Sequence, residues 1–435
     1  MATELETGHR TGTPTAVRRR GSRKSRTPQR DSGRPSPRML FLLGPAFVAA
    51  IAYVDPGNVA ANLTAGARFG YLLVWVLVAA NAIAMLIQYQ SAKLGLVTGR
   101  SLPEMLGDRL GTTGRRAFWL QAEIVAAATD VAEVIGGAIA LNLLFGLPLI
   151  VGGFIVGVIS MLMLAVQSRR GQRTFEAVIM GLLAIIAVGF VAGLFVSTVD
   201  WPAASGGLVP RFDGADSVLL AASMLGATVM PHAIYLHSSL ARDRHGRPSG
   251  ASAVTRLIRA TRWDVVIALV IAGAVNIAML LLAAASLNGV GATDTIEGAH
   301  AAISASLGPV IGVIFAVGLL ASGLASTSVG CYAGAVIMSG LLRVRVPLLL
   351  RRVVTMVPAL IILGIGIEPT WALVLSQVLL SLGIPFALIP LIRLTGDRRV
   401  MGIHADAWWT RLLAWVAATL IIVLNIALIV LTLTG

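Results

Sequence analysis

Long apolar segments follow one another along nearly the whole chain, and this succession constrains the fold more than any other feature. We count eleven, each of about the length needed to cross a bilayer as a helix, roughly 20 apolar residues. The chain is 57% hydrophobic and only 12% charged over 435 residues, a composition that excludes a water-soluble globular fold of this size. The predicted spans are 39–63, 71–97, 117–145, 147–167, 176–198, 215–240, 263–287, 307–341, 347–367, 371–393 and 409–433.

The basic residues predict how these spans are oriented. If the N-terminus lies in the cytoplasm and the spans alternate, 22 of the 34 Lys and Arg residues fall in cytoplasmic connections, and only Arg68 and Arg211 fall in external ones. Such an excess is typical of cytoplasmic loops. Residues 1–38 hold the other ten, with no apolar run, and we expect a disordered basic cytoplasmic tail attracted to anionic lipid. The C-terminus is expected on the external side.

The middle of the first span holds the sequence AYVDPGN, residues 52–58, which interrupts the apolar run. A carboxylate at membrane depth costs about 2.5–3.5 kcal/mol, so Asp55 is a candidate functional residue. Pro56 and Gly57 are poor helix formers, and together they predict an unwound turn beside the charge. The alternative is a proline kink with Asp55 in an ion pair, but this span contains no Lys or Arg as a partner.

A second break is predicted in the sixth span, where GATVMPH occupies residues 226–232. Pro231 stands at mid-depth, as Pro56 does. The first and sixth spans are five apart in an alternating succession, so they cross the membrane in opposite orientations. Interrupted helices at corresponding positions of two inverted halves are the best sequence indication of a transporter's binding site. We therefore expect the two breaks to form one site.

The residues at the two breaks favour a divalent transition-metal ion. Asp55 offers a carboxylate and Asn58 a side-chain carbonyl, and the unwound turns free the backbone carbonyls of Ala52 and Ala227. Met230 adds a thioether. Mg²⁺ and Ca²⁺ prefer oxygen ligands alone, whereas Mn²⁺ or Fe²⁺ can use both kinds of donor. The single cysteine, Cys331, is expected to be a buried apolar residue.

Ionisable residues elsewhere in the spans suggest a path for protons, in addition to Asp55 itself. Three acids of the third span share one helical face, two histidines follow Pro231, and two arginines begin the ninth span, where they could pair with the acids. These residues are Glu123, Asp130, Glu133, His232, His237, Arg351 and Arg352. A static ion pair that fixes helix register is the alternative, and for Glu123 the two readings stay open.

The motifs Asp55-Pro56-Gly57-Asn58 and Met230-Pro231-His232 resemble those of the Nramp family (natural resistance-associated macrophage proteins), and the resemblance covers residues 39–433. It implies an all-α polytopic membrane protein of eleven transmembrane helices in a LeuT-like five-plus-five inverted repeat with helices 1 and 6 broken. The repeats would be about 39–198 and 215–393, followed by an extra helix at about 409–433.

The same resemblance implies function: proton-coupled import of Mn²⁺, Fe²⁺ and related ions such as Cd²⁺ and Co²⁺ across a bacterial cell membrane. The metal would be bound by the donors named above, joined by Gln377 of the tenth helix, and protons would pass through the third-helix acids and His232. One departure lies after the eighth helix, where Ala335 and Ser339 stand in place of a family Gln and Glu. It puts a role of that segment in doubt.

Two other functions remain as alternatives. A cation-coupled amino-acid transporter of the same fold would use helix N-termini for a carboxylate group, and a passive cation channel would show rings of like residues. An enzyme is not expected, since the chain has no cofactor motif and no connection long enough for a soluble catalytic domain. We expect no cofactor, nucleic acid or obligate protein partner; the expected partners are the transported ions and the lipid bilayer.

Overall fold

The computed structural model describes residues 44–246, 250–291 and 295–434, which form helices and their connections without any strand in those ranges. The predicted tail, 1–38, and the first residues of the first span lie outside this description. Eight helical segments among the described residues are long and apolar enough to cross a membrane. The remaining spans are the broken first one, the 17-residue α14 (Leu348–Gly364) and α15 (Pro369–Gly396). The multi-pass helical architecture is confirmed, whereas the count of eleven stays a prediction.

The first span is broken as the sequence predicts. It consists of α1 (Pro45–Ala50), a 3-10 turn at Ile51–Tyr53 and α2 (Pro56–Phe69). Asp55 has extended backbone geometry and caps α2 by accepting the N–H of Asn58. The carbonyls exposed by the break are satisfied from neighbouring helices: Asn276 Nδ2 donates to Tyr53 O at 2.7 Å, and Ser322 Oγ donates to Val54 O at 2.5 Å. The unwound backbone is therefore held by designated donors, as buried polar groups require.

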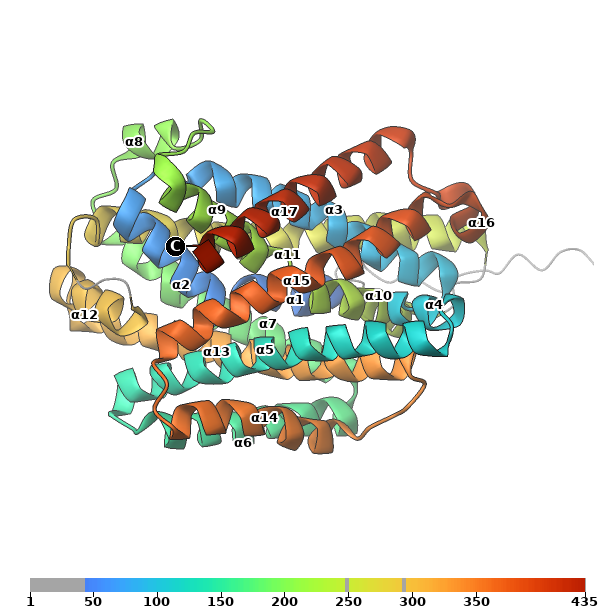
Figure 1. The fold of residues 1–435 in the computed structure, drawn as a ribbon, viewed down its shortest axis with the longest axis horizontal. Helices are drawn as coiled ribbons and strands as arrows, with labels where there is room; N and C mark the ends of the chain where they lie inside the picture. Colours follow the sequence, from blue (N-terminus) through green and yellow to red (C-terminus); the bar gives the residue numbers. More distant parts are fainter. Residues whose placement is uncertain (1–43, 247–249, 292–294, 435) are drawn as a thin grey trace, which may run out of the picture. The chain divides into compact units, whose positions relative to one another are not determined.

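The sixth span is broken in the same way. Helix α9 (Gly214–Thr228) ends three residues before Pro231, and α10 (Pro231–His245) starts at that proline with Met230 as its N-cap residue. Because Pro231 has no N–H, it cannot continue the hydrogen bonding of α9. The two broken helices lie against each other in opposite directions, with α2 beside α9 and α1 beside α10. The breaks consequently meet inside the helix bundle (Figure 1).

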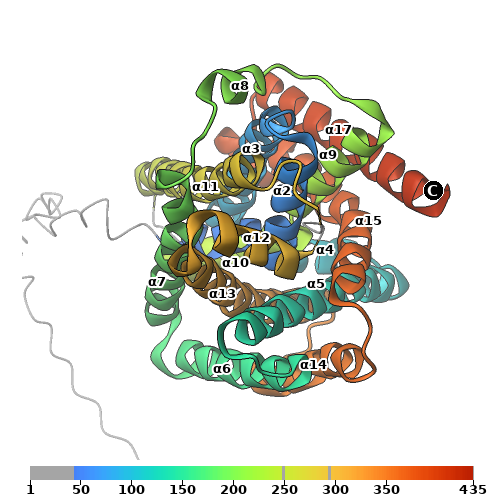
Figure 2. The same cartoon turned by 90° about the vertical axis from the view of Figure 1, so that its left-hand side faces the viewer.

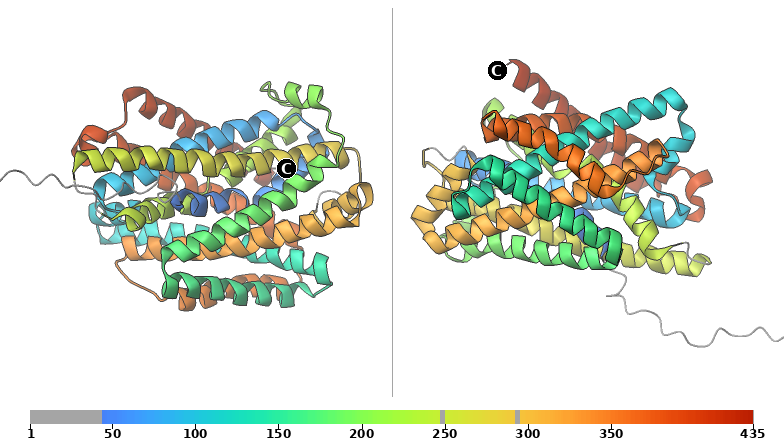
Figure 3. Two further views of the ribbon diagram at one scale, coloured as in Figure 1. Left: turned by 180° about the vertical axis from the view of Figure 1, so that it is seen from behind. Right: turned by 90° about the horizontal axis from the view of Figure 1, so that it is seen from below.

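The remaining long helices surround the broken pair. Helix α11 (Ala251–Ser286) packs on α2 and α3 (Val74–Thr98), and α5 (Thr112–Phe145) packs on α13 (Pro309–Leu341). Figure 3 shows α11, in yellow, running along the bundle when it is seen from behind. The outer helices are α6 (Leu149–Arg170), α7 (Gln172–Val191) and α17 (Trp408–Thr434), together with α14 and α15.

Close helix contacts depend on glycine at two places beside the first break. Gly136 of α5 lies against the ring of Pro56, and any side chain at position 136 would collide with that ring. Gly137 of α5 and Gly323 of α13 meet backbone to backbone, so a Cβ on Gly323 would lie 2.9 Å from Gly137. Small residues allow helix backbones to approach in membranes. They place α5 and α13 directly beside the unwound turn.

Short helices at the two ends were not predicted from the apolar pattern. One end carries α4 (Leu102–Arg109) and α16 (Arg398–Met401); the other carries α8 (Trp201–Gly206) and α12 (Ile296–Leu307) (Figures 1 and 2). The first of these ends is called the arginine-rich end below. The capping box of Ser101 and Glu104 is a sequence signal for α4. Helix α11 also starts at Ala251, twelve residues before the predicted span, because its polar first turns extend the helix beyond its apolar part.

One buried carboxylate fixes the start of α1. Asp264 of α11 is 2% exposed and accepts the N–H groups of Gly44 at 3.0 Å and Ala46 at 2.9 Å. The first N–H groups of a helix have no partner within the helix, so Asp264 supplies what a local cap would otherwise provide. It thereby ties the short α1 to the longest helix of the fold.

We expect Asp264→Ala to lower the stability of the protein markedly. The substitution leaves two buried N–H groups without an acceptor, and each such group costs about 1–3 kcal/mol. Thermal unfolding of the purified protein in detergent should show a lower midpoint, with Asp264→Asn in between because an amide retains one accepting oxygen. Asp216→Ala, which removes an exposed ion pair with Arg68, is the control. An Asp264→Ala midpoint equal to the control's would contradict this role.

Candidate functional site

The structure brings Asp55, Asn58 and the carbonyl of Ala227 into one cluster between the two helix breaks. Asn58 Nδ2 donates to Asp55 Oδ1 at 2.6 Å and to Ala227 O at 3.0 Å. Asp55 and Asn58 are each 1% exposed and Ala227 is fully buried. Asp55 Oδ2 has no hydrogen-bond partner among the described residues. A buried carboxylate oxygen without a donor is unfavourable, and a positively charged partner would stabilise it.

The side-chain amide of Asn58 occupies a position that suits a cation. Its NH₂ group carries partial positive charge and contacts a carboxylate and a backbone carbonyl, both of which are ligands for hard cations. If the amide turned by half a rotation about its last side-chain bond, Asn58 Oδ1 would face the same space. Ala227 O and Asp55 Oδ1 would then be released as acceptors. The cluster can therefore exchange an amide donor for a metal ion without movement of the backbone.

The other predicted donors border the same breaks. Met230 is fully buried and lies at the start of α10, and Ala52 lies in the 3-10 turn four residues before Pro56, which has no N–H to offer its carbonyl. Gln377 of α15 is buried, and its amide lies directly against Gly57. A Cβ on Gly57 would also lie 3.4 Å from Asp55 Oδ2, so the absence of a side chain at position 57 lets the Gln377 amide lie close to the first break.

No group of three or more His, Cys, Asp or Glu side chains is close enough to hold a metal ion within the described ranges. The candidate site contains a single carboxylate, and its other donors are amides, backbone carbonyls and a thioether. A weakly charged donor set of this kind suits transient binding better than permanent retention, because affinity for a cation rises with the number of charged ligands.

The acids of α5 lie in a row that starts beside Asp55. Glu133 is fully buried, interacts electrostatically with Asp55 and Asp130, and has no hydrogen-bond donor in good geometry among the described residues. Asp130 forms a buried ion pair with Arg352, and Thr327 Oγ1 donates to it at 2.5 Å. Towards the start of α5, Glu123 pairs with Arg351 at 2.7 Å. The pairing expected from the sequence is thus present, with one arginine for each of two acids.

The two histidines after Pro231 face different neighbours. His232 is buried close to Asp130, and neither of its ring nitrogens has a hydrogen-bond partner in the described structure. His237 Nδ1 lies 2.8 Å from Gln88 Oε1, and Gln88 Nε2 donates to the Tyr53 hydroxyl at 2.7 Å. His232 therefore joins the α5 acids, whereas His237 belongs to a separate chain that leads back to the first break.

Several polar residues of these networks were assigned no role from the sequence. They are uncharged polar residues within apolar spans, where single residues of this kind are common and give no signal of their own. These residues are Tyr53, Gln88, Ser160, Asn276, Ser322 and Thr327. The available signal was a carboxamide in a membrane span, since such groups need partners there. Gln88 and Asn276 could have been selected on that ground, although their partners could not.

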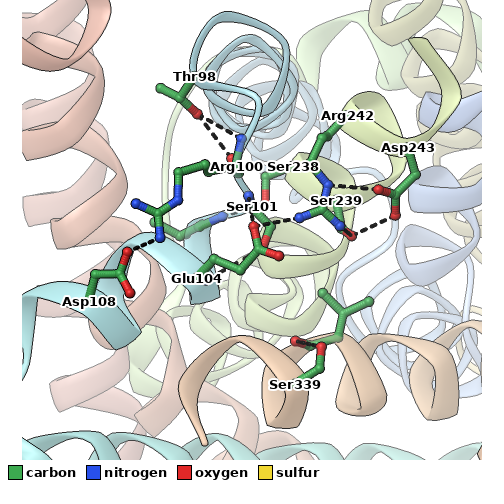
Figure 4. Close-up of polar contacts among 12 residues, drawn as sticks. Thr98, Arg100, Ser101, Glu104, Asp108, Ser238, Ser239, Arg242, Asp243 and Ser339 are labelled. Carbon is green, nitrogen blue, oxygen red and sulfur yellow. Dashed lines mark hydrogen bonds and ion pairs between the residues drawn. The ribbon is translucent and has the colours of Figure 1, made fainter. Parts of the chain in front are cut away.

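A polar cluster at the arginine-rich end connects α4 with α10 (Figure 4). Arg242 pairs with Glu104 at 2.5 Å, and Ser238 Oγ accepts the N–H of Leu102 at 2.9 Å. Burial alone would raise the pKa of the Glu104 carboxyl, but hydrogen bonds from the Ser101 N–H and from Arg242 outweigh it and hold that pKa below its ordinary value. Glu104 therefore remains ionised at neutral pH, and the α10 end stays tied to α4.

Ser339, the residue that departs from the family pattern, borders this cluster. Its hydroxyl donates to Val336 O of its own helix at 3.0 Å and to no charged partner in Figure 4. Arg343 instead pairs with Asp108 of α4 at 2.8 Å. Arg343, a few residues beyond the position of the departure, thus adds an ion pair to the direct packing of α13 on α4.

Comparison with known proteins agrees with the motifs at both breaks. Residues 46–431 match the family described as Nramp, natural resistance-associated macrophage protein-like. The chain belongs to the Nramp family. A Mycobacterium tuberculosis (strain H37Rv) protein named divalent metal cation transporter MntH is 62% identical over 395 residues, which cover 91% of this chain and 92% of that relative.

Solved structures agree with this Nramp assignment at the level of the fold. The Eremococcus coleocola manganese transporter superposes with a TM-score of 0.83 at 31% identity, over 90% of this chain and 86% of that one. Mhp1, a nucleobase-cation-symport-1 family transporter, superposes with a TM-score of 0.59 at 16% identity, over 89% of this chain and 91% of that one, and shares the fold alone.

We expect Gly57→Ala to weaken Mn²⁺ binding although it removes no donor atom. The new methyl group would collide with the Gln377 amide and approach Asp55 Oδ2, and overpacking of this kind costs about 1–3 kcal/mol. Calorimetric titration of the purified protein with Mn²⁺ measures the effect. Gly181→Ala, on α7 with open space around it, is the matched control. Equal affinities of the two variants would contradict the close approach of Gln377 to the site.

Proposed function

We propose that this protein imports divalent transition-metal ions, Mn²⁺ or Fe²⁺ and related ions such as Cd²⁺ and Co²⁺, in symport with protons by alternating access. The name of the mycobacterial relative, divalent metal cation transporter, supports the class of substrate. The metal would be held by Asp55, Asn58, Met230, Gln377 and the carbonyls of Ala52 and Ala227. The bacterial cell membrane, with the N-terminus cytoplasmic and the C-terminus external, is the proposed location.

One observation carries this proposal. Asp55 Oδ2 is a buried carboxylate oxygen to which no residue of the described ranges donates, at the meeting point of two helix breaks that also present a carbonyl, an amide and a thioether. The negative charge of this carboxylate attracts a cation and repels an anion. An amino-acid substrate is disfavoured for the same reason: the cap N–H of Asn58 is already taken by Asp55, whose charge would repel a substrate carboxylate.

Met230 accounts for the choice of metal. A thioether adds nothing to binding of Mg²⁺ or Ca²⁺, but it is an acceptable ligand for borderline-soft ions. Met230 lies at the second break, as the N-cap residue of α10, and its sulfur-containing side chain is fully buried there. Selectivity would thus come from one residue across the site from the charge that any cation attracts.

Protons would leave the site along α5. Asp55, Glu133 and Asp130 interact in sequence, with His232 close to Asp130 and Arg352 paired with Asp130. Binding of a cation at Asp55 adds positive charge next to Glu133, which favours release of a proton from this row. Because Glu123 and Arg351 lie nearer the start of α5, towards the arginine-rich end, the proposed direction of proton release is the cytoplasm.

Asp55→Ala tests the site most simply. The substitution removes the charged ligand, and we expect it to abolish Mn²⁺ uptake into proteoliposomes that contain the purified protein. Asp213→Ala, an exposed acid whose side chain caps no helix, should transport normally. Uptake by Asp55→Ala at the rate of this control would refute the site.

Met230→Leu tests the origin of selectivity at nearly constant volume. We expect partial Mn²⁺ uptake to remain while the preference for Mn²⁺ over Ca²⁺ falls by roughly tenfold, about 1.4 kcal/mol. Met279→Leu, a second fully buried methionine on α11, provides the control. Competition of Mn²⁺ uptake by Ca²⁺ and Mg²⁺ measures the ratio, and an unchanged preference in Met230→Leu would refute the role of the thioether.

Asp130→Asn tests the proton row. Since Asp130 touches the row and not the metal cluster, the variant should lose metal-driven acidification of the vesicle interior more than it loses Mn²⁺ binding. Asp108→Asn, which breaks an exposed ion pair with Arg343 outside the proposed row, is the control for the loss of an ion pair. Equal proton flux in Asp130→Asn and the unmodified protein, recorded with an internal pH dye, would count against the row.

A further inference from the structure

A cavity of about 430 Å³ opens at the arginine-rich end, away from the helix breaks. It lies between α3, α11 and the start of α17, and the 3-10 turn at Gly402–His404 closes one side. Its wall has two parts. Met85, Ile258 and Val265 form an apolar part, whereas Arg262, His404 and the Lys93–Asp406 pair form a polar part. This division suits a ligand with one charged end and one hydrocarbon end.

The polar part carries a net positive charge. Lys93 and Asp406 form an ion pair in which both side chains are nearly buried, and Gln90 also donates to Asp406 at 2.8 Å. These charges neutralise each other. Arg262 is exposed and takes part in none of the ion pairs found among the described residues. Its guanidinium is thus available to a ligand anion in the cavity.

The part of α11 that lines the cavity lies among exposed arginines and tryptophans, which are typical of a membrane interface. Arg256, Arg259 and Arg262 are all exposed and recur every third residue along the first turns of α11. Trp409 of α17, which is 54% exposed, lines the cavity, and Trp263, which is 51% exposed, follows Arg262 on α11. Tryptophans gather where acyl chains meet headgroups, and basic clusters at that depth attract anionic lipids.

We propose that this cavity binds an anionic phospholipid of the surrounding membrane. Arg262 would form charge-assisted hydrogen bonds with the lipid phosphate, beside His404. The first part of an acyl chain would lie on Met85, Ile258 and Val265. A cavity of this volume is within the range of ligand sites. The proposal concerns a lipid ligand on the outer side of the bundle and does not depend on the transported ion.

Native mass spectrometry of the full-length, delipidated protein in detergent tests the proposal. The protein is titrated with phosphatidylglycerol or with phosphatidylcholine of the same acyl chains. We expect preferential binding of phosphatidylglycerol. Arg262→Gln should weaken that binding by roughly fivefold, as expected for one basic residue at an anionic surface, and should weaken phosphatidylcholine binding less, because the choline cation offsets the charge of its phosphate. Trp409→Ala should weaken binding of both lipids, and Arg116→Gln, an exposed arginine on α5, is the charge-matched control.

A competing titration with millimolar inorganic phosphate distinguishes a lipid site from a site for a free anion, and we expect no displacement of bound lipid. The proposal is overturned if the two lipids bind equally, if Arg262→Gln binds phosphatidylglycerol as the control does, or if phosphate displaces the lipid. Because Arg262 is exposed and unpaired by any described carboxylate, its replacement should leave the thermal midpoint unchanged, which verifies that the variant is folded.

Discussion

The buried carboxylate of Asp55 is the constraint on which the rest of the structure depends. An acid at membrane depth is costly, and this one keeps an oxygen without a hydrogen-bond donor in the part of the chain that the structure describes. It is tolerated because the backbone beside it is unwound and Asn58 offers both its N–H and its amide. The hydrogen-bonding capacity of Asp55 is thus only partly used, and Oδ2 can still contact a positively charged partner. Such a site can be filled and emptied, which a fully satisfied ion pair cannot.

Other helices hold the unwound turn in place without filling it. Asn276 and Ser322 donate to the carbonyls of Tyr53 and Val54, and Gly136 allows α5 to lie against Pro56. Asp264 secures the start of α1 from α11. The short first half of the broken helix is therefore connected at both ends to the long helices around it. A transported ion would reach Asp55 only when these helices shift relative to α1 and α10, as alternating access requires.

Local chemistry explains how much the sequence could predict. Proline removes a backbone donor wherever it stands, so Pro56 and Pro231 predicted both breaks, and the opposite orientation of their spans predicted that they meet. The positions of Glu123, Asp130, Arg351 and Arg352 also predicted which helix would pair with α5. Each of these inferences uses either a fixed backbone rule or a charge that needs a partner.

What could not be predicted depends on helix rotation. His237 faces Gln88 while His232 faces Asp130, a separation set by where α10 turns after Pro231. The donors Asn276 and Ser322 come from spans far along the chain and have no motif. The amide of Asn58 is turned with its NH₂ towards Ala227. This orientation is set by the two acceptors around it, Asp55 Oδ1 and Ala227 O, and cannot be read from the residue type. The start of α11 was misplaced because hydropathy marks the apolar part of a helix and not its polar extension.

The central claim is that a metal ion binds between the two breaks with Asp55 on one side and Met230 on the other. Anomalous diffraction from crystals grown with Mn²⁺ tests it directly. We expect one strong peak within coordination distance of the Asp55 carboxylate and the Met230 sulfur, with the Asn58 amide turned so that Oδ1 faces the ion. A peak that lacks contact with Met230, or an Asn58 NH₂ that still bridges Asp55 and Ala227 beside a bound ion, would contradict it.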